Sequence, residues 1–384
     1  MTSFTVPETA GSGINALNFA KYINSVRDKA TVLSFSRNCR YPLKTTIEGV
    51  HVRRIPYFNK HIILKILSLP IILAFYIFMI LKHRIIYIYG GKIIGWQILI
   101  AFSRILNRKI VFQALLKGVD DMSSLIENHN IFSRTILKGI IQLIHVYHAI
   151  NKDFIYDKST FCFKGGTLVL PQGIDANLFS PINRSQQTII RNKLNLPPNR
   201  FIIVSTGFLI SRKGYIEVFK ALSILKFDFL YVVLAEKDYD RDHFLYNQRS
   251  YTLGVIEKGE KVLEKKIYFA GYRNNVADYM RCGDLFLHNA ELEGFPNALL
   301  EAMACGIPII MKKIDGITGN FIQHGEHALV YRHKEEIPDL VDKIYHSPKL
   351  RQALGSNARK VIIDHYSFSK IYPQVINKIR EIRY

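Results

Sequence analysis

Two carboxylates lie eight positions apart in the stretch HNAELEGFPNALLEAMACGIPII, residues 288–310. Glu293 precedes a Gly-Phe-Pro turn, and Glu301 lies inside a predicted helix that ends at Gly306. The backbone amides that follow Gly294 would begin this helix and would face an anion or a sugar oxygen. Because a carboxylate accepts hydrogen bonds from hydroxyl groups, the pair suits a ligand with hydroxyls at both ends, such as a nucleotide sugar.

Two further turns have residues that suit a phosphate-bearing ligand. In STGFLISRKGY a predicted strand ends at Gly207, and Arg212 and Lys213 precede a predicted helix. An arginine fork and a lysine point charge could hold a diphosphate there; a solvated basic turn is the alternative. In PETAGSGIN, Gly13 follows a predicted strand and would let a phosphate approach the backbone. An ordinary strand–helix turn is the alternative for that glycine.

Short apolar runs alternate with helical segments along the whole chain. Runs that stay apolar without alternation are typical of strands buried on both faces of a parallel sheet. The polar stretch 180–200 divides the pattern into two halves. We therefore predict an α/β fold of two doubly wound, Rossmann-like domains that face each other across a cleft. The predicted strands are TSFTVP, ATVLSFS, RIIYIYG, KIVFQAL and TLVLPQG in the first half, and RFIIVSTG, FLYVVLAE, KIYFAGY, LFLHNA and IPIIMK in the second.

The predicted boundaries follow from this division. Residues 1–180 form the first domain and residues 181–366 the second, and residues 367–384 form a C-terminal helix that packs back towards the first domain. In such sheets ligands bind beyond the carboxyl ends of the strands. All three turns described above occupy such positions.

The charge of the chain is strongly positive and unevenly distributed. In 384 residues, 52 Lys and Arg oppose 31 Asp and Glu, a net charge of +21. Between Lys21 and Lys109 there are 16 basic residues and 2 acidic ones. Such an excess favours anionic partners, which include nucleic acid, an acidic membrane surface and phosphorylated ligands. Four scattered cysteines indicate neither a disulfide framework nor a zinc site, and fit a reducing cytoplasm.

One apolar run stands out within this basic region. Residues 62–81, IILKILSLPIILAFYIFMIL, are long enough for a bilayer, but Lys65, Ser68 and Pro70 interrupt them. Basic residues flank the run on both sides. A core helix, a membrane-surface helix and a transmembrane span are the three alternatives. The first residues show no basic segment followed by an apolar core, so we expect no secretory signal.

The motifs together resemble a known family. EGFPNALLEAMACGIPII resembles the E-x7-E signature of the family 4 retaining glycosyltransferases of the GT-B fold, and GFLISRKG resembles their phosphate-binding turn. PQGIDANLFSP resembles their crossover between domains, and the likeness extends over nearly the whole chain. The E-x7-E block is specific, whereas the N-terminal matches are loose.

This resemblance implies roles for individual residues. Glu293 would contact the donor sugar, Glu301 the ribose, and Arg212 with Lys213 the diphosphate leaving group. The other donor-binding residues implied are Gly294, Phe295, Gly207, Tyr272, Arg273, Asn274 and Gly13. No metal or cofactor is expected, because cations and helix N-termini would stabilise the leaving group.

The chain departs from the family pattern at two places. Phe208 stands where many members have an arginine, and no histidine follows the strand KIVFQAL in the first domain. Gln113, Asp120 and Asp121 are the polar candidates there, and Asp121 could equally cap a helix. Two histidines, His145 and His148, are predicted to pack on a helical apolar face, whereas His288 ends a strand on the cleft side and could either pack or face a ligand.

The implied activity is retaining hexosyl transfer from a nucleotide sugar, UDP- or GDP-linked, to a hydroxyl of a glycan acceptor. The basic, apolar first domain suggests a lipid-linked acceptor in cell-envelope polysaccharide or lipopolysaccharide synthesis. We therefore expect a peripheral enzyme on the cytoplasmic face of the membrane. A GT-B sugar-nucleotide epimerase is the alternative. A nucleic-acid binder is less favoured, because the chain lacks interleaved aromatic and basic residues, zinc spacing and a reading helix.

Overall fold

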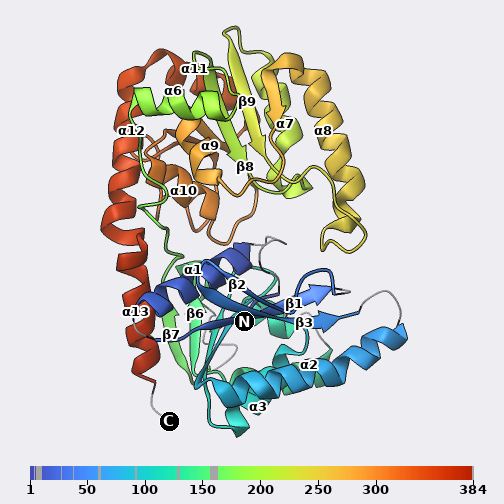
Figure 1. Ribbon diagram of the computed structural model, residues 1–384. Helices are drawn as coiled ribbons and strands as arrows, with labels where there is room; N and C mark the ends of the chain where they lie inside the picture. The colour runs from blue at the N-terminus through green and yellow to red at the C-terminus, as the bar shows by residue number, and fades with distance from the viewer. Residues whose placement is uncertain are drawn as a thin grey trace. The chain divides into compact units, whose positions relative to one another are not determined.

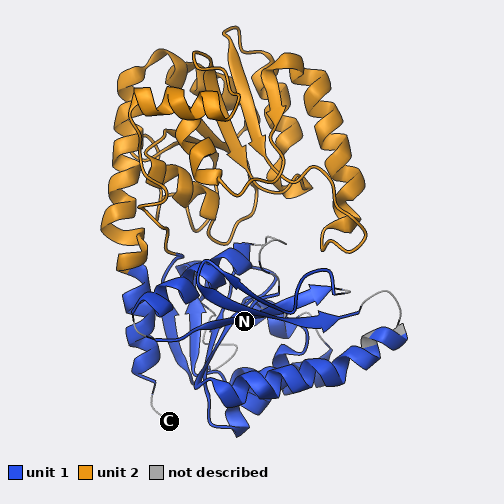
Figure 2. Cartoon of the chain, viewed as in Figure 1, with its two compact units in different colours: residues 1–172, 371–384 blue, residues 173–370 orange. Residues whose placement is uncertain are grey.

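The computed structural model describes residues 1–3, 5, 11–26, 28–37, 39–58, 62–90, 93–127, 130–155 and 163–382. The chain forms two compact units, unit 1 (residues 1–172 and 371–384) and unit 2 (residues 173–370) (Figure 2). The predicted boundary at 180/181 lies eight residues later than the observed one. Ile174 explains part of this difference, because its N–H and C=O bond to Tyr366 and Phe368 within unit 2, both at 2.9 Å.

Unit 2 contains one parallel sheet of six strands in the order β10-β9-β8-β11-β12-β13 (Figure 1). Adjacent β8 residues face different core clusters: Ile202 and Val204 belong to one, and Ile203 to the other. The sheet is therefore buried on both faces, as its unbroken apolar runs predicted. The strands are β8 (Phe201–Thr206), β9 (Phe229–Leu234), β10 (Ile267–Phe269), β11 (Leu285–His288), β12 (Ile309–Lys312) and β13 (Leu329–Tyr331).

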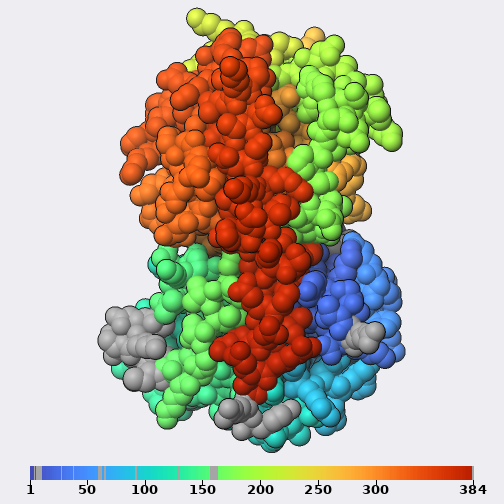
Figure 3. Space-filling view, turned by 90° about the vertical axis from the view of Figure 1, so that its left-hand side faces the viewer, coloured from blue at the N-terminus to red at the C-terminus, as the bar shows by residue number. Residues whose placement is uncertain are grey.

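The helices of unit 2 include several that the sequence pattern did not reveal. Four helices were not predicted. They are α6, which lies in the polar stretch 180–200, and the charged helices α8, α11 and α12. Figure 3 shows α12, in red, on the surface of its unit. The bounds are α6 (Arg184–Lys193), α7 (Tyr215–Ser223), α8 (Arg249–Leu263), α9 (Val276–Cys282), α10 (Asn297–Cys305), α11 (Ile337–His346) and α12 (Pro348–Val361).

The described residues of unit 1 form two sheets. Four parallel strands follow the order β4-β5-β6-β7, and three strands follow the order β1-β3-β2, in which β2 is antiparallel to β3. Predicted strand TSFTVP lies partly outside the described residues, and its described part is not a strand. The backbone N–H of Thr2 nevertheless donates to the carbonyl of Leu33 in β1 at 3.0 Å. The bounds are β1 (Thr31–Arg37), β2 (Lys44–Ile47), β3 (Val50–Tyr57), β4 (Ile85–Tyr89), β5 (Lys109–Gln113), β6 (Val146–Ala149) and β7 (Gly166–Val169).

The prediction that His145 and His148 lie on a helix is wrong. His148 lies in β6, and His145 directly precedes this strand. The run IIQLIHVYHAI is apolar throughout, so periodicity alone could not separate the end of a helix from the start of a buried strand. Both side chains have structural contacts: Nδ1 of His145 accepts from Ile110 N–H at 3.1 Å, and Nε2 of His148 contacts the Leu170 carbonyl at 2.8 Å.

The helices of unit 1 are α1 (Gly11–Ser25), α2 (Ile62–Lys82), α3 (Trp96–Ile105), α4 (Met122–Glu127), α5 (Ile131–Ile141) and most of α13 (Phe368–Arg380). The chain enters unit 1 for the second time within α13. The aromatic ring of Tyr372 then packs on Phe19 and Tyr22 of α1, with ring centroids 5.0 and 5.1 Å apart. These contacts place the C-terminal helix against the first domain.

Helix α2 is buried on one face and exposed on the other. Ile72, Tyr76 and Ile80 are buried, whereas Ile66 and Leu67 are 58% and 59% exposed. Pro70 lies inside the helix. Among the described residues, no helix combines the length and apolar character needed to cross a membrane.

A buried arginine joins three segments of unit 2. The side chain of Arg191 on α6 is fully buried, bonds to the Cys282 carbonyl at 3.0 Å and pairs with Asp284 at 2.7 Å. Asp284 in turn accepts from the Ile202 N–H of β8 at 2.8 Å. The cluster therefore holds the start of β11 against β8.

We expect Arg191→Met to lower the free energy of unfolding by about 3–5 kcal/mol, because it leaves a largely buried carboxylate without its cation and several carbonyls without their donor. Arg184→Ala is the matched control: Arg184 reaches the same Asp284 at 3.5 Å, but its side chain is 64% exposed. That control should cost no more than about 1 kcal/mol. Urea denaturation measures both values, and equal costs would contradict the role given to burial.

Candidate functional site

The site in unit 2 begins with two neighbouring strands. β8 and β11 pair in parallel, with Leu285 opposite Ile203, so both strands end at the same edge of the sheet. The turns that follow them are therefore adjacent. A backbone hydrogen bond from Glu291 N–H to the Arg212 carbonyl, 2.9 Å long, joins the two turns directly.

Glu293 and the two predicted cations meet at this edge. Lys213 Nζ donates to Glu293 Oε1, and Arg212 Nη1 lies 3.4 Å from the same oxygen. The side chains of Lys213 and Glu293 are each 12% exposed. Burial opposes ionisation of Glu293, yet its pKa lies below the ordinary value because the cations Lys213 and Arg212 stabilise the anion. The turn thus holds a carboxylate and two cations in one half-buried cluster.

Gly207 and Gly214 allow the two turns to approach each other. Gly207 has φ 135°, and a Cβ there would lie 3.4 Å from Lys213 Nζ. Gly214 has φ 59°, and a Cβ there would lie 2.2 Å from the side chain of Asn289. Both backbone conformations are ones that favour glycine. The lysine is therefore packed directly over the end of β8.

Asn289 is a site residue that the sequence analysis missed. Its amide donates to the Gly214 carbonyl at 2.5 Å, and its side-chain oxygen accepts from Tyr331 OH. Asn289 is buried and so ties the turn after β8 to the turn after β11. Its position directly after a strand was the available signal, but nothing local indicates that its partner lies 75 residues away.

His288 lies behind the ion cluster at the end of β11. Its side chain is 3% exposed, and its Nε2 lies 3.9 Å from Glu293 Oε1. Within the part of the chain that the structure describes, this nitrogen has no hydrogen-bond partner. Burial, together with Lys213, lowers the pKa of His288 to about 3. The imidazole is therefore neutral near pH 7, and its contact with Glu293 is not an ion pair.

The second glutamate has a different environment. Glu301 lies on α10, which begins at Asn297 after the turn that contains Glu293. Burial raises the pKa of Glu301 to about 7, and no cation of the described residues offsets this effect. Gly294 is buried, and Phe295 packs on Phe321 with ring centroids 4.9 Å apart.

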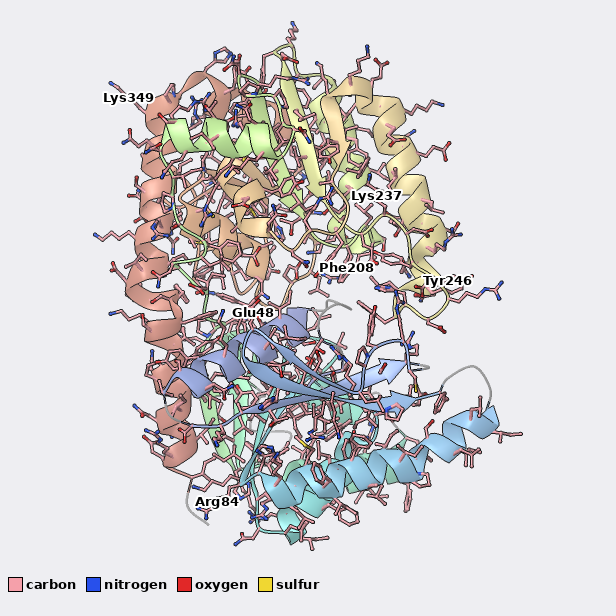
Figure 4. All side chains as sticks on the ribbon, viewed as in Figure 1. Glu48, Arg84, Phe208, Lys237, Tyr246 and Lys349 are labelled. Carbon is pink, nitrogen blue, oxygen red and sulfur yellow. The ribbon has the colours of Figure 1, made fainter. Side chains whose placement is uncertain are left out.

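The remaining donor-side candidates lie near the same edge of the sheet. Tyr272, Arg273 and Asn274 follow β10 on an exposed turn. Phe208, labelled in Figure 4, follows β8, and its ring packs on Phe244 with centroids 5.6 Å apart. An aromatic contact thus occupies the position at which many members of the resembled family have an arginine.

The candidates in unit 1 have mostly local partners. Gln113 is buried, and its Oε1 accepts from Tyr87 OH at 3.2 Å. Asp120 accepts from the backbone N–H of Leu116 at 2.7 Å, and Asp121 accepts from Ser124 N–H at 3.1 Å at the start of α4. Asp121 therefore caps a helix, which is one of its two predicted roles. The remaining candidate of unit 1, Gly13, is buried in the first turn of α1.

No group of His, Cys, Asp and Glu among the described residues has the arrangement of a metal site. A cavity of about 510 Å³ does lie in unit 1, where Arg104, His145, Gly166 and Lys378 contribute to its lining. It opens at the amino ends of β6 and β7. Because ligands of doubly wound sheets bind at the carboxyl ends, we place the functional site at the Glu293 cluster instead.

Comparison of the whole fold with solved structures agrees with this organisation. Sucrose-phosphate synthase from Thermosynechococcus elongatus superposes with a TM-score of 0.75 at 16% sequence identity, covering 97% of this chain and 94% of that chain. The fold is GT-B. The predicted fold class is thereby confirmed, and the candidate site lies at the strand ends of the second GT-B unit.

Sequence comparison concerns mainly that second unit. Residues 186–361 match the family model described as "Glycosyl transferases group 1". N-acetyl-alpha-D-glucosaminyl L-malate synthase of Bacillus anthracis is 32% identical over 114 residues, which cover 29% of this chain and 30% of that relative. UDP-Gal:alpha-D-GlcNAc-diphosphoundecaprenol alpha-1,3-galactosyltransferase of Escherichia coli is 23% identical over 223 residues, 56% of this chain and 53% of that relative. The chain thus spans about half or less of these relatives.

The pKa of Glu301 gives a testable pH dependence. Its folded-state pKa of about 7 exceeds the ordinary value of 4.5, so the folded chain binds the extra proton between these pH values. Stability should therefore fall as pH rises from about 4.5 to about 7, by up to ~1.4 kcal/mol per pH unit. Glu301→Gln should remove this fall.

Urea denaturation of the parent and of Glu301→Gln from pH 5 to pH 8 measures the difference. The control is Glu257→Gln, which changes an exposed carboxyl on α8. A stability difference between Glu301→Gln and the parent that stays constant over this range would show that burial does not hold the proton.

Proposed function

We propose that this protein is a retaining glycosyltransferase that moves a sugar from a nucleoside-diphosphate sugar to a hydroxyl of a glycan acceptor. The observation that carries the proposal is the cluster of Glu293, Lys213 and Arg212 at the joined ends of β8 and β11. It lies within residues 186–361, the segment that matches the group 1 glycosyltransferase model. Cations beside a carboxylate suit a ligand that combines a diphosphate with sugar hydroxyls.

In the proposed reaction, the bond between the anomeric carbon and the diphosphate oxygen breaks while the acceptor hydroxyl forms a new bond on the same face. Arg212 and Lys213 stabilise the charge that develops on the diphosphate. The departing phosphate oxygen takes the acceptor proton, so the step needs no separate base. Glu293 is held as an anion by its cations and binds the sugar hydroxyls. Glu301 binds the ribose, and no metal or cofactor takes part.

We further propose a lipid-linked acceptor and a place on the cytoplasmic membrane surface, in cell-envelope polysaccharide or lipopolysaccharide synthesis. The E. coli relative is named for a diphosphoundecaprenol substrate. In unit 1, the helices α2, α3 and α5 contain no Asp or Glu. Their exposed apolar side chains include Ile66, Leu67, Leu81, Ile105, Ile131 and Phe132.

Basic residues accompany this apolar surface. Lys82 ends α2, Arg84 follows it (Figure 4), and Arg134 and Lys138 lie on α5. Each cation near an anionic membrane contributes about 1 kcal/mol of attraction. Apolar side chains with a cationic border are the combination that favours peripheral binding to anionic lipid. α5 was not part of the sequence-based membrane hypothesis.

A sugar-nucleotide epimerase of the same fold gains no support from the relatives, which are named as a synthase and a transferase. A nucleic-acid binder gains none either. The positive charge of unit 1 is accounted for by the proposed membrane surface.

A thermal-shift screen against UDP-, GDP- and ADP-sugars tests the donor site. A ligand at 100 times its Kd should add about 2.7 kcal/mol of stability. Arg212→Ala together with Lys213→Ala should weaken binding of the corresponding nucleoside diphosphate about 100-fold, because two charge-assisted contacts are lost. The control, Lys220→Ala with Lys226→Ala, removes the same charge from exposed positions of unit 2. Equal affinities of the two double variants would rule out the proposed diphosphate site.

Vesicle flotation tests the membrane surface. The protein should float with anionic vesicles at low salt and be released at high salt. Ile66→Ser with Leu67→Ser should reduce the bound fraction at low salt, since both exposed side chains would enter the lipid. The matched control is Ile189→Ser with Ile224→Ser, which changes two residues of unit 2 that are 54% and 67% exposed. If the parent protein fails to float at low salt, the proposed surface is wrong.

A further inference from the structure

His288 is a buried polar group that the mechanism above does not use. Its side chain lies at the carboxyl end of β11, is 3% exposed, and stacks near Phe286 with ring centroids 6.2 Å apart. Its Nε2 has no hydrogen-bond partner within the described part of the chain. A buried nitrogen left in this state costs about 1–3 kcal/mol. Such a cost is understandable where a ligand supplies the missing partner.

The distance of this nitrogen from Glu293 indicates what the partner is. Nε2 lies 3.9 Å from Glu293 Oε1, which is too far for a direct hydrogen bond. A carboxylate only accepts hydrogen bonds, so a group with one proton that bridges the two atoms uses this proton on Glu293, and His288 then donates from the tautomer with a proton on Nε2. One oxygen at about 2.8 Å from both atoms can bridge them. That oxygen must donate to Glu293 and accept from His288, which is what a hydroxyl group does.

We infer that His288 and Glu293 together bind one hydroxyl of the transferred sugar, and that His288 is a specificity-determining residue for that hydroxyl. This inference rests on the proposed function. The hydroxyl donates to Glu293 Oε1 and accepts from His288 Nε2–H. A free nucleoside diphosphate has no group for this position, because it lacks the transferred sugar.

The cations beside Glu293 fit the same arrangement. Without ligand, Lys213 Nζ donates to Glu293 Oε1. A bound diphosphate attracts Lys213 and leaves the carboxylate oxygen to the sugar hydroxyl. The diphosphate and the hydroxyl are thus bound by different atoms of one cluster. Substitution of His288 should therefore affect the sugar and not the diphosphate.

The experiment measures binding by calorimetry, with the nucleotide sugar that gives the largest thermal shift and its monodeoxy analogues at each sugar position. In the parent protein, removing one particular hydroxyl should weaken binding about tenfold or more. In His288→Phe, which keeps a ring and loses the N–H, that penalty should nearly vanish. The same position should lose part of its penalty in Glu293→Gln, because a neutral amide oxygen is a weaker acceptor than a carboxylate. Affinity for the free nucleoside diphosphate should stay within about twofold in His288→Phe.

His288→Gln is the companion variant, because its amide can still donate and should restore most of the penalty. If the phenylalanine variant does not fold, His288→Leu, which also lacks the N–H, takes its place. The inference is overturned if the deoxy penalties of both histidine variants match those of the parent at every position, or if His288→Phe weakens the free diphosphate as much as the nucleotide sugar. If the parent binds no nucleotide sugar, the proposed function itself fails.

Discussion

Leu285 and Ile203 pair in parallel at the centre of the six-stranded sheet, and this pairing fixes where β8 and β11 end. Asp284 reinforces it, because one carboxylate oxygen accepts from Ile202 N–H and pairs with the buried Arg191. The two turns that carry charge are consequently held side by side. The carboxylate and the cations of the site come from segments 80 residues apart and meet only through this register.

Packing at the two turns then determines which cations lie beside each glutamate. Gly214 lets Asn289 lie against the backbone, and Gly207 lets Lys213 lie over the end of β8. The cations stabilise Glu293 as an anion, whereas Glu301 has no such partner among the described residues and retains its proton up to about pH 7. Two glutamates of one sequence motif thus have opposite pKa shifts. Burial raises the pKa of both carboxyls, and the cations beside Glu293 reverse the shift there.

Unit 1 shows a different balance of forces. Its helix α2 uses one face to cover the sheet, while the apolar residues of the other face remain exposed. Asp120 and Asp121, the predicted acceptor-side acids, accept hydrogen bonds from backbone N–H groups close to them in sequence. The distinctive property of this unit is therefore its apolar and cationic surface, on which the proposed membrane contact depends.

The sequence by itself determined the parallel architecture of the second unit, because strands buried on both faces are apolar without interruption. It also predicted Glu293, Lys213 and Arg212 as candidates, since glycine turns after such strands are recognisable locally, and the structure brings their side chains together. It did not reveal β2, β3, β6 or β13, where apolar runs are short or merge with a neighbouring helix. The contacts of Asn289 and the buried position of His288 became visible only in the tertiary structure. The partners of Asn289 are distant in sequence, and Nε2 of His288 has none among the described residues. Burial, which makes an unpaired polar atom costly, is a property of the folded chain.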